Sequence, residues 1–146
     1  LMATCAELVG AQLPENAAED SFSFLPVLWG KASGPVRETL ILHSVSGKFA
    51  IRQGPWKLLL APGSGGWSRP GDAEARRQGL PEVQLYNLAD DPAEQKNLQA
   101  QHPEMVQRLV QLLERQVSEG RTRPGPTQKN DATVDIWKRP PPSAKP

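Results

Sequence analysis

The chain has 146 residues with a net charge of +1, 38% hydrophobic residues, 15 prolines and 12 glycines. This near balance of charge excludes a strongly basic surface of the kind that binds nucleic acid. No apolar run reaches the length of about 18 residues that a membrane-spanning helix needs. The single cysteine excludes an internal disulfide framework and a zinc site built on cysteines. The composition predicts a small folded core with long irregular segments, and neither nucleic acid nor a membrane as a partner.

The first residues have the pattern of an amphipathic helix. Apolar residues recur at helical spacing from residue 1 to residue 9, and Gly10 ends the pattern. No capping residue precedes this helix, so we expect the chain to be part of a longer protein. On the helix the thiol of Cys5 is predicted to be buried and structural. A second short helix is expected in SFSFLPVLWGK, with Pro26 in its first turn and Gly30 at its end.

Between residues 37 and 61 the hydrophobic period changes to two. RETLILHS is predicted to be a strand covered on both faces, and KFAIRQ and WKLLLA are predicted to form a hairpin. Gly54 provides the positive φ that a tight turn needs, and Pro55 is expected at the edge of this turn. Arg52 and Lys57 flank the turn, and we expect their charges to bind nearby acids or carbonyls.

The second half of the chain alternates irregular segments with two further elements. Residues 62–82 are rich in glycine, proline and charge and are predicted to be one long loop. VQLYNL is predicted to be a fourth strand, and in DDPAEQKNL we expect a capped turn with Asp91 as N-cap and Glu94 in a capping box. A clear helical stripe follows between Pro103 and Gly120. In the Pro-rich tail, three residues are expected to be able to dock on the fold: Val134, Ile136 and Trp137.

These elements predict an α+β fold, with a small antiparallel sheet of about four strands covered by the C-terminal amphipathic helix. The two short helices before the sheet are expected to be part of a longer protein. We therefore divide the chain into three parts. Residues 1–36 are the helical N-terminal part, residues 37–123 are the sheet with its helix, and residues 124–146 are an extended tail.

A search for catalytic residues finds no complete set. His102 is expected to be exposed at a helix start, and the pair Asp90 and Asp91 is better explained by capping than by a metal. His43, at the end of a strand, is expected to have a structural or solvent role, with pocket lining as the alternative. The indole of Trp67 could stack on a sugar or aryl ring, but we favour a ring folded back on the sheet. The residues alone therefore predict neither a catalytic residue nor a metal ligand.

Two motifs and the helix after them carry a family resemblance. AIRQGPWK fits the pattern A-[IV]-R-x-G-x-[WY]-K, and LYNLADDPAEQKNL fits L-[YF]-[DN]-L-x-x-D-P-x-E-x-x-N-L. Together they resemble the C-terminal part of a type I sulfatase, of the arylsulfatase A-like kind in the alkaline phosphatase superfamily. The two N-terminal helices also resemble stretches of that family, so the resemblance runs from residue 1 to about residue 123. It implies that these helices, in residues 1–36, are the end of a larger catalytic α/β domain that is absent here. The matching residues of the two motifs are Ala50, Ile51, Arg52, Gly54, Trp56, Lys57, Leu85, Tyr86, Asn87, Leu88, Asp91, Pro92, Glu94, Asn97 and Leu98.

The resemblance implies the end of an enzyme without its reaction centre. Family members hydrolyse sulfate esters with a formylglycine, made in a C/S-x-P/A-x-R motif, and with a calcium ion held by Asp and Asn residues. All of these would lie upstream of residue 1, and Cys5 is followed by AELV, which does not fit the motif. We therefore expect this chain to complete the fold and to line the substrate entrance, but to be inactive alone. The residues expected to contact substrate are His43, Ser64 and Trp67.

The resemblance also implies partners and a location. The partners would be the missing N-terminal catalytic domain and, for the parent enzyme, a sulfated small molecule or glycan as substrate. A periplasmic or secreted location is expected for the parent. Two alternatives stay open at this point: a stand-alone small binding or interaction module, and the C-terminal part of a related phosphodiesterase or phosphonate hydrolase.

Overall fold

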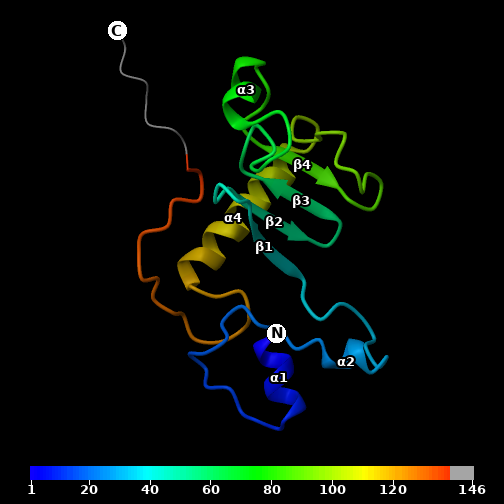
Figure 1. Cartoon of the computed structure of the whole chain (residues 1–146), viewed down its shortest axis with the longest axis vertical. Helices are drawn as coiled ribbons and strands as arrows, with labels where there is room; N and C mark the ends of the chain where they lie inside the picture. The colour runs from blue at the N-terminus through cyan, green and yellow to red at the C-terminus, as the bar shows by residue number, and fades with distance from the viewer. Residues whose placement is uncertain (139–146) are drawn as a thin grey trace.

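The computed structural model describes residues 1–138 and contains one antiparallel sheet with a long helix on it (Figure 1). The sheet has four strands in the order β1-β2-β3-β4, and every neighbouring pair is antiparallel. This confirms the predicted α+β fold with its C-terminal helix. In chain order the elements are α1 (Met2–Leu8), α2 (Leu25–Leu28), β1 (Thr39–His43), β2 (Phe49–Gln53), β3 (Trp56–Leu59), α3 (Asp72–Arg77), β4 (Gln84–Asn87) and α4 (Pro103–Glu119).

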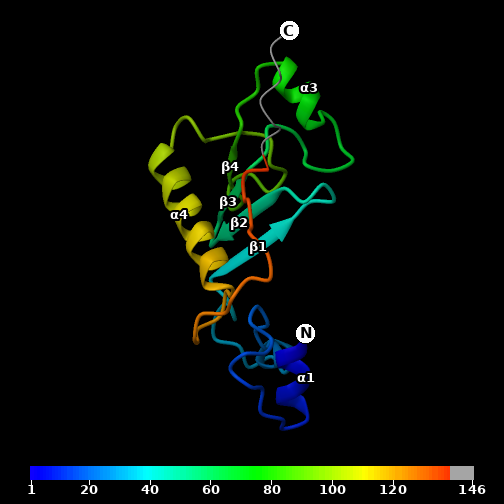
Figure 2. The same ribbon diagram turned by 90° about the vertical axis from the view of Figure 1, so that its left-hand side faces the viewer.

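The core lies between one face of the sheet and α4, which runs along that face in Figure 2. Ile51, Leu58 and Leu85 lie side by side across β2, β3 and β4 and are fully buried. Leu109 and Leu113 of α4 are fully buried against them. Each such side chain stabilises the fold by about 1.5–3 kcal/mol through the apolar surface that it removes from water. The amphipathic helix predicted from the sequence is thus the cover of the sheet.

The hairpin of β2 and β3 has the predicted turn. Gly54 has a φ of +56°, and Nε of Arg52 donates to the carbonyl oxygen of Gly54 at 2.9 Å. Nζ of Lys57 binds both carboxylate oxygens of Glu94, at 2.6 and 2.8 Å. The expectation that these two cations bind a nearby carbonyl or acid is confirmed.

Two local predictions after the hairpin are wrong. The segment predicted to be one loop contains α3, whose side chain Ala75 is fully buried. The capping box is also absent from the turn after β4, because Glu94 adopts a positive φ of 56° and points its carboxylate at Lys57. Asp91 does act as an acceptor there, since its Oδ2 takes the backbone N–H of Lys96 at 2.8 Å. The long-range ion pair therefore replaces the local cap.

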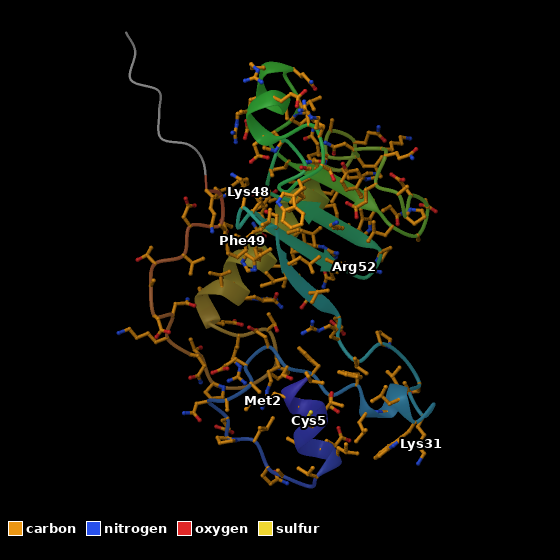
Figure 3. All side chains as sticks on the ribbon, in the orientation of Figure 1. Met2, Cys5, Lys31, Lys48, Phe49 and Arg52 are labelled. Carbon is orange, nitrogen blue, oxygen red and sulfur yellow. The ribbon has the colours of Figure 1, made fainter. Side chains whose placement is uncertain are left out.

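Three burial predictions are also corrected. The first strand is at the edge of the sheet, and Leu42 and His43 at its end are exposed rather than covered on both faces. Cys5 is exposed on α1 (Figure 3) and not buried. Trp67 is 92% exposed, so its ring does not fold back on the sheet. Ile136, by contrast, is 6% exposed and joins the core, which confirms that the tail docks.

The N-terminal arm, residues 1–36, lies beyond the end of the sheet in Figures 1 and 2. Its helices contact each other, and hydrogen bonds tie the arm to the segment just after α4, where Oδ1 of Asp20 accepts the backbone N–H of Thr122 at 2.9 Å. The arm carries most of the exposed large apolar residues: Leu1, Met2, Leu8, Val9, Val27, Leu28 and Trp29. The assignment of this arm to a larger domain stays a prediction.

Candidate functional site

The face of the sheet opposite α4 carries a different set of side chains. The strand register places Leu42, Ala50, Leu59 and Gln84 in one row across the four strands on this open face. Lys57 and Tyr86 stand beside one another in the next row. Small, aliphatic and polar side chains thus replace the tightly packed core of the other face.

A cavity of about 640 Å³ lies over this open face, and we call it the open-face cavity. Its walls are the sheet, the loop of residues 62–70 and the turn of residues 92–94. Both His43 and Ser64 line it, so the structure brings together two of the three residues predicted to contact substrate. The size lies within the range of cavities that take small ligands.

Three cations line the open-face cavity and set its charge. Lys57 is neutralised by Glu94, and Nζ of Lys48 lies 3.3 Å from the carboxylate of Asp72. The side chain of Arg69 is 89% exposed, and its distance to the nearest carboxylate partner is 3.9 Å. Each of the three cations thus has a carboxylate within 4 Å, and Arg69 is the most exposed of the three and has the longest ion-pair distance.

The loop that forms one wall is held by Gln84 on β4. Nε2 of Gln84 donates to the carbonyl oxygens of Ala61 and Gly63, both at 2.7 Å, and its Oε1 accepts the hydroxyl of Tyr86 at 2.6 Å. Burial of the Tyr86 ring raises the pKa of its hydroxyl, and the nearby carboxylate charges add to this effect. Tyr86 therefore stays protonated and keeps donating at neutral pH, so a continuous chain of hydrogen bonds positions the loop.

Within the loop, Ser64 and Trp67 have different surroundings. The Ser64 hydroxyl donates to the carbonyl oxygen of Ser68 at 2.6 Å and accepts the backbone N–H of Gly66 at 3.2 Å. Ser64 thus shapes the loop from inside. Trp67 extends into solvent beyond the residues that line the cavity.

His43 lies at the edge of the sheet, on the side of α4. Its ring stands edge to face with the ring of Phe49, with a centroid distance of 4.1 Å. Being at the edge, it lines the open-face cavity and also a second cavity on the helix side. His43 is therefore a lining residue, which is the alternative that the sequence left open.

The sequence search missed four residues that build the open-face cavity: Lys57, Gln84, Tyr86 and Glu94. Three of them belong to the two motifs, but their meeting depends on pairing between strands far apart in the chain. The alternation in VQLYNL places Gln84 and Tyr86 on one face, so the sequence held a signal for them. Nothing local relates Lys57 to Glu94, which is 37 residues away.

The described residues do not fit a calcium or formylglycine site. Within residues 1–138 no group of three or more His, Cys, Asp or Glu side chains is placed to hold a metal ion. Cys5 is exposed on α1 and lacks the flanking residues of the modification motif. None of the helices in that part of the chain combines the length and the apolar character needed to cross a membrane.

Comparisons with known proteins match most of this chain to about a fifth of much longer ones. A curated N-acetylgalactosamine-6-O-sulfatase of Bacteroides thetaiotaomicron is 36% identical over 117 residues, which are 78% of this chain and 22% of that protein. No family model matches the chain.

Solved structures agree with the curated relative. One from a study of glycosaminoglycan metabolism by Bacteroides thetaiotaomicron is 34% identical with a TM-score of 0.62 and covers 79% of this chain and 23% of that one. Another, solved with its substrate D-glucosamine-2-N,6-O-disulfate, is 23% identical with a TM-score of 0.53 and covers 77% of this chain and 22% of that one. This second likeness concerns the fold alone.

Proposed function

This chain corresponds to a C-terminal portion of a sulfatase, and from that premise we propose that it completes an enzyme that hydrolyses sulfate esters of glycans. The observation that carries the proposal is the 36% identity to an N-acetylgalactosamine-6-O-sulfatase across 78% of the chain. The reaction itself belongs to residues that this chain does not contain, namely a formylglycine and a calcium site in a preceding catalytic domain. An export of the parent enzyme from the cytoplasm is part of the same proposal.

The part that this chain plays is to form one wall of the substrate entrance. The open-face cavity supports this role, because it is large enough for a sugar unit and carries the exposed cation Arg69 among its lining residues. A sulfated glycan is anionic, and a cation at the mouth of a cavity attracts it before any specific contact forms. Trp67, exposed on the loop beside Arg69, offers a ring face on which a sugar can stack.

The first test reads the coding sequence upstream of residue 1. A catalytic domain with a C/S-x-P/A-x-R motif is expected there, and an upstream sequence without that motif would refute the proposal. Sulfate release by the protein expressed with that domain then identifies the reaction. The same assay with a phosphate ester separates a sulfatase from the related phosphodiesterases.

The second test concerns the cavity and uses the protein that carries the catalytic domain. Arg69→Gln is expected to raise KM for a sulfated sugar about threefold to tenfold at low salt and to lose this effect at high salt, because the contribution is a screened charge. Arg77→Gln is the matched control, since Arg77 is exposed on α3 and does not line the cavity. Equal KM values for both variants would exclude the open-face cavity from substrate binding.

A further inference from the structure

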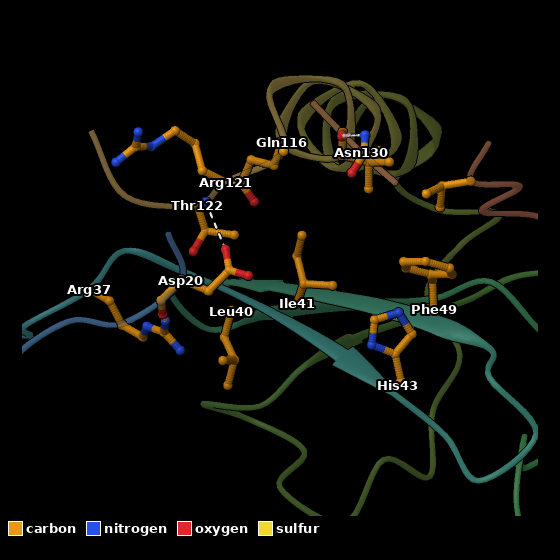
Figure 4. A pocket seen from close by; sticks show the side chains of 13 residues that line it. Asp20, Arg37, Leu40, Ile41, His43, Phe49, Gln116, Arg121, Thr122 and Asn130 are labelled. Carbon is orange, nitrogen blue, oxygen red and sulfur yellow. Dashed lines mark hydrogen bonds between the residues drawn. The ribbon is translucent and has the colours of Figure 1, made fainter. Parts of the chain in front are cut away.

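The C-terminal tail reaches the beginning of β2 along the core. Ile136 of the tail is buried on the side of α4, and Phe49, the first residue of β2, belongs to the same cluster. Figure 4 shows the ring of Phe49 on this side of the sheet, the side on which Asn130 of the tail also lies. Nζ of Lys138 lies 5.7 Å from the centroid of that ring. The tail therefore follows the core as far as the end of the sheet where β2 begins.

Lys48, which directly precedes β2 and is labelled in Figure 3, holds the end of this tail. Its Nζ donates to the carbonyl oxygen of Lys138 at 2.9 Å, across 90 residues of sequence. The same Nζ lies 3.3 Å from Oδ2 of Asp72, the first residue of α3. One ammonium group thus joins the tail to α3.

The ammonium group of Lys48 depends on both contacts because it is largely removed from water. The side chain is only 10% exposed, and a buried cation needs an opposite charge together with further acceptors. Within residues 1–138, Lys48 is the one cation within 4 Å of the Asp72 carboxylate. When the tail leaves, Nζ loses its carbonyl acceptor and water reaches the ion pair, which weakens the attraction. The hold of Lys48 on Asp72 therefore depends on the tail.

Asp72 stands at the base of the loop that forms one wall of the open-face cavity. The two ends of the loop meet here, because the backbone N–H of Ser64 donates to the carbonyl oxygen of Pro70 at 2.9 Å. Gly63 is pressed against the same place, since a Cβ atom on it would lie 2.7 Å from the backbone nitrogen of Asp72. A displacement of Asp72 is therefore also a displacement of the base of the loop.

The turn before Lys48 holds a second point of the same loop. The hydroxyl of Ser46 donates to the carbonyl oxygen of Gly65 at 2.6 Å. In the same turn, Oγ of Ser44 accepts the backbone N–H of Lys48 at 3.0 Å. The position of Lys48 is therefore tied to the loop through its backbone as well as through its ammonium group.

We propose that Lys48 is a clamp through which docking of the tail sets the position of the loop that walls the open-face cavity. With the tail docked, the ammonium group holds Asp72 and fixes the base of the loop. With the tail released, the clamp loosens and the loop becomes mobile. The coupling is reciprocal, so a change at Asp72 also loosens the tail. The proposal concerns the geometry of the cavity and does not rest on the sulfatase function.

The test follows amide hydrogen exchange by NMR in the 146-residue chain. Two amides report on the base of the loop: that of Ser64, and that of Ala75, which donates to the carbonyl oxygen of Gly71 at 2.8 Å. Ile136→Ala loosens the tail from the opposite face of the sheet and is expected to speed exchange at both amides about tenfold. Met105→Ala truncates a core residue at the other end of α4 and is expected to leave both rates unchanged within about twofold.

The charge of the clamp is tested by Lys48→Met, which keeps the length of the side chain. This substitution is expected to speed exchange at the same two amides about as much as Ile136→Ala does. Adding Ile136→Ala to it should then change these rates little further, because the connection is already broken. Lys129→Met makes the same chemical change at an exposed lysine of the tail and is expected to leave the loop unchanged.

The reverse direction is tested at the other end of the clamp. Asp72→Asn removes the charge that holds Lys48 and leaves the tail itself intact. It is expected to speed exchange several-fold at the amide of Trp137, which donates to Oδ1 of Asp135 at 2.9 Å. An unchanged rate at Trp137 would contradict a reciprocal clamp.

Three other results would overturn the proposal. Slow exchange at the loop in both the Ile136 and the Lys48 variants would show that the tail does not control the loop. Fully additive effects of the two substitutions would show two independent contacts. A loop that opens as much in Met105→Ala would show a general loss of stability. None of these results bears on sulfate release, so each is distinguishable from a failure of the proposed function.

Discussion

Nζ of Lys57 on β3 lies 2.6 Å from Oε1 of Glu94 in the turn after β4, and this ion pair closes one side of the open-face cavity. The two side chains are 21% and 32% exposed, so the pair is partly screened by water. Glu94 adopts a positive φ to reach this position, which is unfavourable for a residue with a side chain. The ion pair with Lys57 therefore offsets the strain of the positive φ at Glu94.

We predict that Lys57 and Glu94 are energetically coupled. Lys57→Met and Glu94→Gln should each lower the unfolding free energy, and the double variant should lose less than the sum, with a coupling of about 0.5–1 kcal/mol. Urea unfolding of the wild type, the two single variants and the double variant measures this coupling free energy. The control cycle uses Arg76 and Glu82. The side chain of Glu82 is 52% exposed, so this pair should have a smaller coupling free energy. Equal coupling in both cycles would contradict a special role for the pair at the cavity.

The second prediction concerns the only tyrosine in the chain, Tyr86. Burial and the carboxylates of Glu94 and Asp91 raise the pKa of its hydroxyl above the ordinary value of 10.0. A pKa that is higher in the folded state contributes stability that is present below pH 10 and is lost as the pH rises through the folded pKa. The unfolding free energy should fall above about pH 10, and Tyr86→Phe should remove most of that fall.

The titration of Tyr86 can be observed directly. Because no other tyrosine is present, the absorbance of the phenolate reports this residue alone. The folded chain should ionise at higher pH than the chain in urea. Identical titration curves in the two states would show that the ring is not in the buried environment that we describe.

The sequence predicted the sheet and its helix because these follow from periodic patterns. Alternation over residues 37–61 and the stripe of α4 are strong local signals, and the structure has both. The errors concern positions where a distant contact overrides a local preference. Glu94, for example, pairs with Lys57 instead of capping the turn. The error at Cys5 is of another kind, because this residue on the apolar stripe of α1 is exposed.

The candidate site was predictable only in part for the same reason. His43 and Ser64 were chosen singly, and their common cavity depends on how the loop of residues 62–70 folds over the sheet. That loop is held in place by hydrogen bonds from Gln84, a residue that belongs to neither of the two sequence motifs. Side-chain pairing between strands therefore determines the cavity, and an unaligned sequence carries little information about it.

We predict that Gln84 is a positioning residue for the loop. Gln84→Leu removes both hydrogen bonds to the carbonyls of Ala61 and Gly63, so the loop should open while the core remains. The expected result is faster amide hydrogen exchange in residues 62–70 with little change in α4. The loss of stability should be about 1–2 kcal/mol, since two buried carbonyls lose their donor. Gln78→Leu, on the exposed end of α3, is the control and should leave exchange in the loop unchanged.

The fourth prediction is that the 146-residue chain alone does not release sulfate from an aryl sulfate, even with calcium added. The described residues offer neither a metal cluster nor a cysteine in the modification motif. The measurement is phenol release compared with a buffer blank. Turnover above the blank that survives repurification would mean that a reaction centre lies within this chain.

The last prediction concerns the tail, which docks on the core through Ile136. This side chain is 6% exposed and belongs to the cluster that includes Leu109 and Leu113 of α4. Ile136→Ala should therefore lower the unfolding free energy by about 2–4 kcal/mol, as expected for a truncated core residue. Val134→Ala is the matched control, because Val134 is 39% exposed and should cost about 0.5 kcal/mol or less. Chemical denaturation separates the two results, and an Ile136 variant as stable as the control would mean that the tail is not part of the core.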